Sequence, residues 1–155
     1  KGVDKKVFFN IFFLETTVFS WKKHLAPANN FNKRSAIKYV TNTSSTRAIG
    51  STYKMRGNFY DAIYRALMDP YADTIFLLSD GGPTAGKYAF PERVKEKVAE
   101  INKFLNFEIH TILIGASSGK NARFMEEFAK ANNGKFYYKG GKYGGKKKRS
   151  KKKKK

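Results

Sequence analysis

The stretch that decides the fold is Asp73–Thr84, with the sequence DTIFLLSDGGPT. Four bulky apolar side chains follow one another from Ile75 to Leu78, where a strand with one wet face would alternate apolar and polar residues. An unbroken run of this kind is typical of a strand covered on both faces, as in a parallel sheet between helices. The polar, glycine-containing turn that follows lets the backbone bend sharply. The stretch therefore predicts a buried strand of an α/β sheet.

Asp80 follows this strand directly. Ligands of open α/β sheets bind outside the carboxyl ends of the strands, so a carboxylate at that edge could contact a metal ion or another ligand. It could equally be a turn residue whose side chain bonds its own backbone. The stretch alone leaves both interpretations open.

Composition and charge place limits on the class of protein. With 155 residues, 41% of them hydrophobic, the chain can build the core of one domain, and it has no cysteine for a disulfide, a thiol nucleophile or a Cys-ligated zinc. No apolar run approaches the ~18–20 residues of a membrane span. The net charge of +20 is uneven, because Lys139–Lys155 holds 11 of the 32 basic residues and none of the 12 acidic ones. We expect residues 1–138 to form the domain and residues 139–155 to be a disordered tail rich in lysine and glycine.

Further strands are expected on both sides of the central stretch. Lys5–Leu14 reads as another buried strand, broken only by Asn10, and Val18–Trp21 as an edge strand paired with it in an antiparallel hairpin. Two later segments, Glu108–Gly115 and Lys135–Tyr138, complete the set.

Helices are expected between these strands. Asn58 is placed to cap a helix whose apolar stripe includes Phe59, Ile63 and Leu67, and Pro91 suits the first position of the clearest amphipathic helix. A short helix with Ala36, Ile37 and Val40 on one face precedes a long loop over Thr41–Arg56, and a last helix is capped by Asn121 and ended by Gly134. The alternation of strands and helices is that of an α/β sheet with right-handed crossovers.

Two blocks of the chain, Asn58–Ile63 (NFYDAI) and Asp73–Thr84, resemble the von Willebrand factor A domain family. Its bacterial members start a helix with an Asn-aromatic-Tyr-Asp-Ala-Leu pattern and end a strand with LLSDG-x-PT. The resemblance covers roughly Val7–Tyr138. It implies a doubly wound, mostly parallel sheet flanked by helices, from which the first strand of the family is missing.

Many members of that family hold a divalent cation in a metal-ion-dependent adhesion site. In the family, three separated segments supply the ligands of this site: Asp-x-Ser-x-Ser after the first strand, a Thr in a middle loop and an Asp after the fourth strand. Asp80 matches the last of these, no Asp-x-Ser-x-Ser occurs, and Gly57 stands where the Thr is expected. Mg²⁺ and Ca²⁺ require about six or more oxygen ligands, so the resemblance implies a degenerate site. We expect no cofactor, unless an upstream segment supplies the ligands that would place Mg²⁺ or Ca²⁺ beside Asp80.

The resemblance implies a protein–protein interaction module that is not an enzyme. Candidate partner contacts are Asp80, Gly82, Thr84, Gly57 and Asn58, with the loop before them as a flexible rim. Catalytic triads need an aligned nucleophile, base and orienter, and no residue pattern here places such a set. The family also favours, slightly, the cell envelope or another extracytoplasmic compartment.

The basic tail supports an alternative function. Lysine runs bind polyanions through charge and counterion release, with little sequence selectivity. The chain could therefore bind nucleic acid or an anionic surface, or the tail could simply be solvated. The candidate residues are Lys146, Lys147, Lys148, Arg149, Lys151 and Lys152.

The absence of the family's first strand should affect the two strands that would flank it. In the family it lies between the strands that correspond to Lys5–Leu14 and Thr74–Leu78. Without it, both strands expose backbone donors and acceptors, whose burial without partners is costly. They must pair directly, stay apart, or take up a strand from a partner or from an upstream segment.

Overall fold

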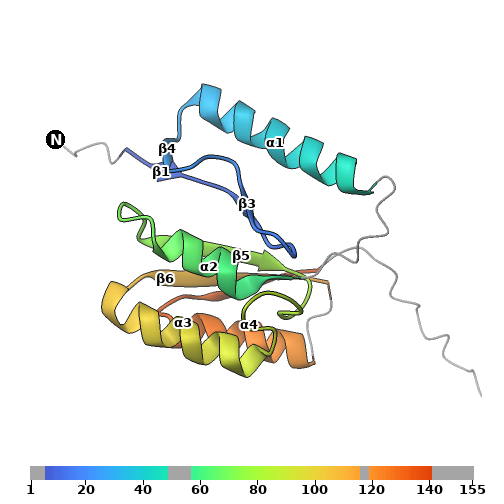
Figure 1. Cartoon of the computed structure of the whole chain (residues 1–155), viewed down its shortest axis with the longest axis vertical. Coiled ribbons are helices and arrows are strands. Elements are labelled where there is room, and N and C mark those ends of the chain that lie inside the picture. The colour runs from blue at the N-terminus through green and yellow to red at the C-terminus, as the bar shows by residue number, and fades with distance from the viewer. Residues whose placement is uncertain (1–5, 49–56, 116–118, 141–155) are drawn as a thin grey trace, which may run out of the picture.

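The computed structural model describes residues 6–48, 57–115 and 119–140 (Figure 1). An N-terminal layer of short strands and one helix precedes a sheet covered by helices. In chain order the elements are β1 (Phe8–Phe9), β2 (Phe12–Phe13), β3 (Phe19–Ser20), β4 (Ala26–Pro27), α1 (Asn30–Ala48), α2 (Phe59–Leu67), β5 (Thr74–Ser79), α3 (Pro91–Leu105), β6 (Glu108–Ile114), α4 (Lys120–Ala131) and β7 (Phe136–Lys139).

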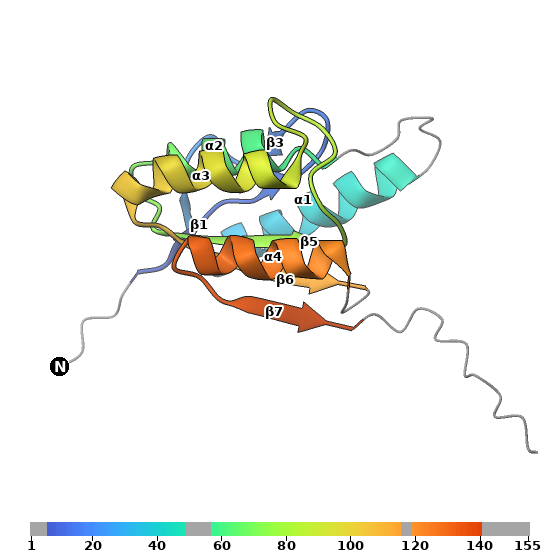
Figure 2. The same cartoon turned by 90° about the horizontal axis from the view of Figure 1, so that it is seen from below.

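The central sheet has the order β5-β6-β7, and both of its pairs are parallel. Helices α2, α3 and α4 cover one face of it (Figure 2). On that face Leu77, Ile109 and Leu113 are buried in one cluster with Val94 of α3 and Phe128 of α4. The fold is thus mixed α/β with a three-stranded parallel sheet flanked by helices. This arrangement is compatible with a von Willebrand A-like or Rossmann-like fold.

The residues that were predicted to start α2 and α3 do so in the structure. The Asn58 side chain accepts a hydrogen bond from the Asp61 N–H and caps α2, and Phe59, Ile63 and Leu67 are buried. Pro91 occupies the first turn of α3. In the described residues no helix is both long and apolar enough to span a membrane.

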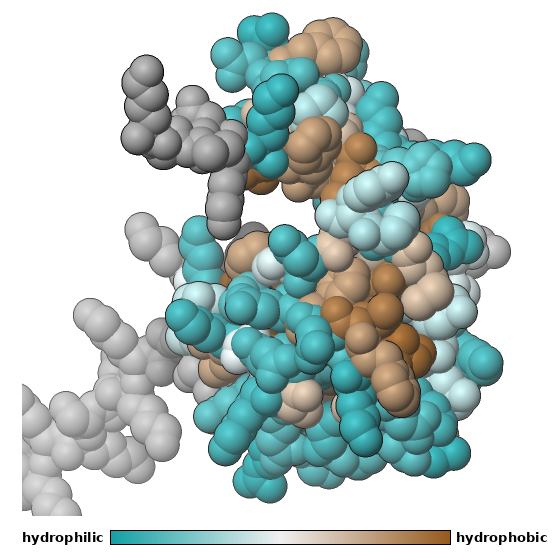
Figure 3. All heavy atoms as spheres, turned by 90° about the vertical axis from the view of Figure 1, so that its left-hand side faces the viewer, coloured by the Kyte–Doolittle hydropathy of each residue, from teal (hydrophilic) through white to brown (hydrophobic). Residues whose placement is uncertain are grey.

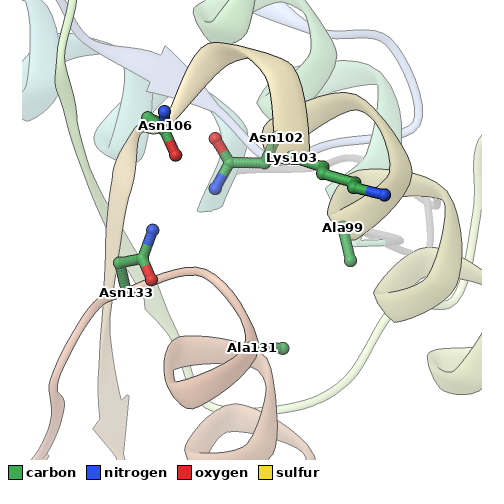
Figure 4. A pocket seen from close by; sticks show the side chains of 6 residues that line it. All are labelled: Ala99, Asn102, Lys103, Asn106, Ala131 and Asn133. Carbon is green, nitrogen blue, oxygen red and sulfur yellow. The ribbon is translucent and has the colours of Figure 1, made fainter.

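Two buried asparagines join the far ends of α3 and α4. The Asn102 amide donates to the Phe107 carbonyl (2.9 Å) and to Asn132 Oδ1 (3.0 Å), and its oxygen accepts from the Phe107 N–H (2.8 Å). Asn102, Asn106 and Asn133 also line a small polar pocket between the two helices (Figure 4). This pocket lies at the amino ends of the strands, away from Asp80, so the asparagine contacts serve the packing of the helices.

The prediction that β5 is buried on both faces is wrong. Leu77 is 3% exposed, whereas Phe76 is 64% and Leu78 is 52% exposed. Successive side chains of a strand point to opposite faces, and the described helices that pack on the sheet cover one face only. A second layer of helices, as a doubly wound sheet requires, is not seen in the described part of the chain.

The prediction of one buried strand over Lys5–Leu14 is also wrong. The segment forms β1, which pairs with β4, and β2, which pairs with β3, all antiparallel. The β2–β3 pair confirms the predicted hairpin. Phe8 remains 49% exposed, and no ladder joins the described part of this segment to β5.

Helix α1 differs from the sequence prediction in length and in the face that it buries. The predicted loop over Thr41–Arg56 is wrong for residues 41–48, which continue the helix, and residues 49–56 lie outside the described residues. No glycine or proline lies between Pro27 and Gly50, so serine and threonine alone do not stop the helix. Ala36 is buried but Ile37 is 66% exposed. The helix meets the N-terminal layer through a hydrogen bond of Trp21 to Ser35 and an aromatic contact of Phe13 with Tyr39. Tail residues 141–155 likewise lie outside the described part.

We expect Gly134→Ala to destabilise the fold. A Cβ at this position would overlap the Ile109 backbone at the start of β6, so the connection from α4 to β7 would have to move. The free energy of unfolding should fall by about 2 kcal/mol, as for other overpacked sites. Urea denaturation of both proteins measures this. Gly81→Ala is the matched control, because its nearest neighbour beyond the adjacent residues would be 3.5 Å away. Equal midpoints for the two variants would contradict the prediction.

Candidate functional site

The carboxyl end of β5 meets the start of α2, and backbone contacts hold the two together. The Gly57 N–H donates to Thr84 Oγ1 (2.8 Å), and the Thr84 N–H donates to the Gly57 carbonyl (2.9 Å). A Cβ at Gly57 would lie 3.4 Å from the Gly82 carbonyl. The structure therefore brings together Gly57, Gly82 and Thr84, three of the five predicted contact residues.

Asn58 is buried beneath this edge and stabilises it through hydrogen bonds. It is 3% exposed, and its amide donates to Asp61 Oδ2 (2.7 Å) and to the Thr16 carbonyl (3.2 Å). At Gly86 φ is +92°, and a Cβ there would overlap the Asn58 amide. Only glycine therefore fits at this position of the loop. Asn58 thus connects the N-terminal hairpin, α2 and the loop after β5. It positions the edge and does not face a partner.

Asp80 is exposed, and in the described residues its side chain has neither a hydrogen bond nor an ion pair. The side chain that bonds the turn is Ser79, whose hydroxyl accepts from the Gly81 N–H (3.2 Å). The interpretation of Asp80 as a residue that bonds its own turn is therefore wrong. Among the described residues nothing occupies its carboxylate, which is exposed.

An aromatic contact fixes the loop that follows Thr84. The Tyr88 ring packs edge-on against Tyr60 of α2, with the ring centres 4.6 Å apart. Tyr60 is buried, and this burial, followed by the charge of Tyr88 and other neighbours, raises the pKa of its hydroxyl. Tyr60 accordingly remains neutral and acts here as a packing residue.

Sequence reasoning missed the role of Asn121. It predicted a helix cap, but Gly119 is the N-cap and α4 begins at Lys120, which leaves Asn121 exposed in the first turn. A Cβ at Gly81 would lie 3.5 Å from its Nδ2, and one at Gly82 would lie 3.4 Å from its Oδ1. Asn121 therefore forms the third side of the edge. The sequence signal for this role was a polar residue, Asn121, at the start of the helix that follows β6, the neighbour of β5.

The residues present do not fit a divalent cation well. In the described ranges no group of three or more histidine, aspartate and glutamate side chains could hold a metal ion. Asp61 is engaged by Asn58, and the Thr84 hydroxyl accepts from Gly57. Asp80 is then the one carboxylate at this edge without a partner in the described residues, against the six or more oxygen ligands that Mg²⁺ or Ca²⁺ prefers.

The histidines lie away from this edge. His110 Nδ1 accepts from the Lys135 N–H (2.9 Å), and its ring lies over Phe76, with the ring centres 4.9 Å apart. His110 is thus a hydrogen-bonded structural residue of β6. His24 is exposed beside Lys22 and Lys23.

Comparison with known proteins supports a relationship to von Willebrand factor A domains. No family model matches the chain. The chain is 26% identical over 130 residues to von Willebrand factor A domain-containing protein 3B of Homo sapiens. The match covers 84% of this chain and 9% of that relative, so the chain spans a small part of the relative's length. The relative is human, and the similarity to bacterial members stays an expectation from the sequence motifs.

We expect Asn58→Ala to destabilise the fold and Asp80→Ala to leave it unchanged. Loss of the cap alone costs about 1 kcal/mol, and loss of the bond to Thr16 adds to it. Substitution of the exposed Asp80 should alter the free energy of unfolding by no more than about 0.5 kcal/mol. Thermal unfolding followed by circular dichroism compares the two. A large loss of stability in Asp80→Ala would show that this carboxylate has an internal partner.

Proposed function

We propose that the chain is a von Willebrand A-like module that binds a protein partner through the loops at the carboxyl edge of β5. The observation that carries this proposal is the exposed Asp80 carboxylate, which has no partner in the described residues and lies in a turn held on both sides. The similarity to a protein with a von Willebrand factor A domain supports it. The role is one of binding and not of catalysis.

The geometry favours binding because the edge is held in place before a partner arrives. The reciprocal Gly57–Thr84 bonds and the contact of Tyr88 with Tyr60 restrict the loops, so little conformational entropy is lost on association. The absence of a side chain at Gly82 lets Asn121 lie close to this turn, which narrows the range of positions open to it.

Asp80 would make the central contact directly, without a bridging cation. A lysine, an arginine or a backbone N–H of the partner can donate to its carboxylate, and hydrogen bonds to a charged group are the stronger kind. The site is in this sense a degenerate adhesion site, which retains the carboxylate and dispenses with the metal.

Site-specific crosslinking tests this function. We would replace Lys87, exposed in the loop after β5, with a photo-crosslinking benzoylphenylalanine, and use the same replacement of Lys103 at the opposite end of the strands as the control. Irradiation in an extract of the source cells should give a protein adduct from position 87 alone. Asp80→Ala should weaken it about tenfold, the effect of losing ~1.4 kcal/mol from a charged hydrogen bond. An adduct that is unaffected by Asp80→Ala, or that requires added Mg²⁺, would overturn the proposal.

A second candidate function is polyanion binding, favoured by the net charge of +20. The run that includes Lys146, Lys147, Lys148, Arg149, Lys151 and Lys152 lies outside the described residues. The described N-terminal layer is itself basic, with Lys22, Lys23, Lys33, Arg34 and Lys38 exposed.

Retention on heparin distinguishes this second function. Removal of residues 141–155 should lower the salt concentration that elutes the chain and reduce the salt dependence of binding, because fewer counterions are released. The crosslink at position 87 should persist in the shortened chain. Unchanged elution would show that the tail does not bind polyanions.

A further inference from the structure

The turn between α4 and β7, residues 132–135, contains an asparagine followed by a glycine. Asn133–Gly134 is the only such pair in the sequence. Asn133 is exposed at the amino ends of the strands, where its side chain lines the polar pocket beside Asn106 (Figure 4). Figure 3 looks onto this end of the molecule, and hydrophilic side chains predominate in its lower half, where α3 and α4 lie. Water therefore reaches the Asn133 amide.

The geometry of the turn requires both residues of this pair. The chain at Asn133 has a φ of +56°, a left-handed conformation that asparagine adopts more readily than most residues with a side chain. A Cβ at Gly134 would overlap the Ile109 carbonyl, so only glycine fits here. The Asn–Gly pair is thus a consequence of the way in which α4 connects to β7.

The same pair is chemically reactive. Asparagine is one of the labile residues of proteins. The backbone nitrogen of Gly134 can attack Cγ of the Asn133 side chain, since a glycine has no side chain to hinder the approach. A C–N bond forms, the bond from Cγ to Nδ2 breaks, and ammonia leaves with the proton that the Gly134 nitrogen loses. Water then opens the cyclic imide at one of its two carbonyls, which leaves either an aspartate or an isoaspartate at position 133.

In the folded turn a hydrogen bond engages the attacking nitrogen. The Gly134 N–H donates to the Ala129 carbonyl (2.9 Å), in the last turn of α4. The preceding residue is held as well, because the Asn132 carbonyl accepts from the Ile109 N–H (3.0 Å). The reaction requires the Gly134 nitrogen to be free and to lose its proton, so the bond to Ala129 must first break.

We propose that Asn133 is a deamidation site that the folded α4–β7 turn keeps closed, so that the modification accumulates in chains whose turn has opened. A native chain opens locally with free energies that lie below that of global unfolding. Water is the co-reactant, and the reaction needs no second protein. The inference goes beyond the proposed binding function and uses none of the residues at the carboxyl edge of β5.

The modification should hinder the turn from closing again. An isoaspartate adds one methylene to the main chain directly before Gly134, where the backbone passes Ile109 without room for a Cβ. An aspartate keeps the length of the main chain but adds a negative charge beside the carboxyl end of α4, where the helix dipole disfavours it. The isoaspartate should therefore destabilise the fold more than the aspartate.

The test compares the rate of deamidation with the rate at which the turn opens. The chain is incubated at one mildly alkaline pH, either folded or unfolded in guanidinium chloride, and peptide mass spectrometry follows the gain in mass at Asn133. We expect the folded chain to deamidate at least ~10-fold more slowly, which corresponds to an opening free energy of about 1.4 kcal/mol. Hydrogen exchange of the Gly134 amide should be slowed by the same factor, because exchange also requires the bond to Ala129 to break.

Asn133→Gly is the matched control, since glycine also adopts the left-handed conformation and has no amide to lose. It should keep the unfolding midpoint of the unmodified chain, whereas a chain that carries isoaspartate should unfold at a lower midpoint than Asn133→Asp. Equal deamidation rates in the folded and the unfolded chain, or an Asn133 that stays intact in the unfolded chain, would overturn the proposal. An isoaspartate chain as stable as the unmodified one would contradict the effect on the turn.

Discussion

The burial of Leu77, Ile109 and Leu113 under α2, α3 and α4 is the interaction on which the rest of the structure depends. It brings three parallel strands into register and makes their carboxyl ends meet at one edge. The residues at that edge are distant in sequence, and this packing brings Gly57 within hydrogen-bond distance of Thr84. Their placement is a consequence of the apolar packing of the helices on the face of the sheet.

The same packing is one-sided, and this accounts for the unusual surface. Parallel sheets are almost always covered on both faces, because their strands carry apolar side chains on each. Here the second face keeps Phe76 and Leu78 in contact with solvent. In the described part of the chain β5 thus has two distinct features: a polar, preorganised turn at its end and an edge along its length that no described strand pairs.

The N-terminal layer packs against the core through Leu14 and is otherwise joined to it by polar contacts. Its strands contact α2 and the turn after it through Arg65, Asp69 and Asn58, so it follows the position of that helix. Asn58 is central to this coupling because one side chain caps α2, contacts the hairpin and faces Gly86.

The sequence by itself determined the elements whose signals are local. The cap at Asn58, the proline at position 91, the hairpin of β2 with β3 and the strand run in β5 and β6 all formed where the pattern predicted. Cap hydrogen bonds, the fixed φ angle of proline and the spacing of apolar side chains act over a few residues. Such signals can therefore be recognised from the sequence alone. The resemblance to von Willebrand factor A domains rests on these same local blocks.

Only the tertiary structure decided which surfaces are covered. The apolar run of β5 could not reveal that one of its faces is exposed, and Ile37 could not be told from Ala36, because burial depends on segments far away in the chain. The approach of Asn121 to Gly81 and the close passage of Gly134 over Ile109 arise in the same way, from crossovers that superimpose distant residues. Local chemistry specifies an element, whereas the partners of that element are a property of the whole fold.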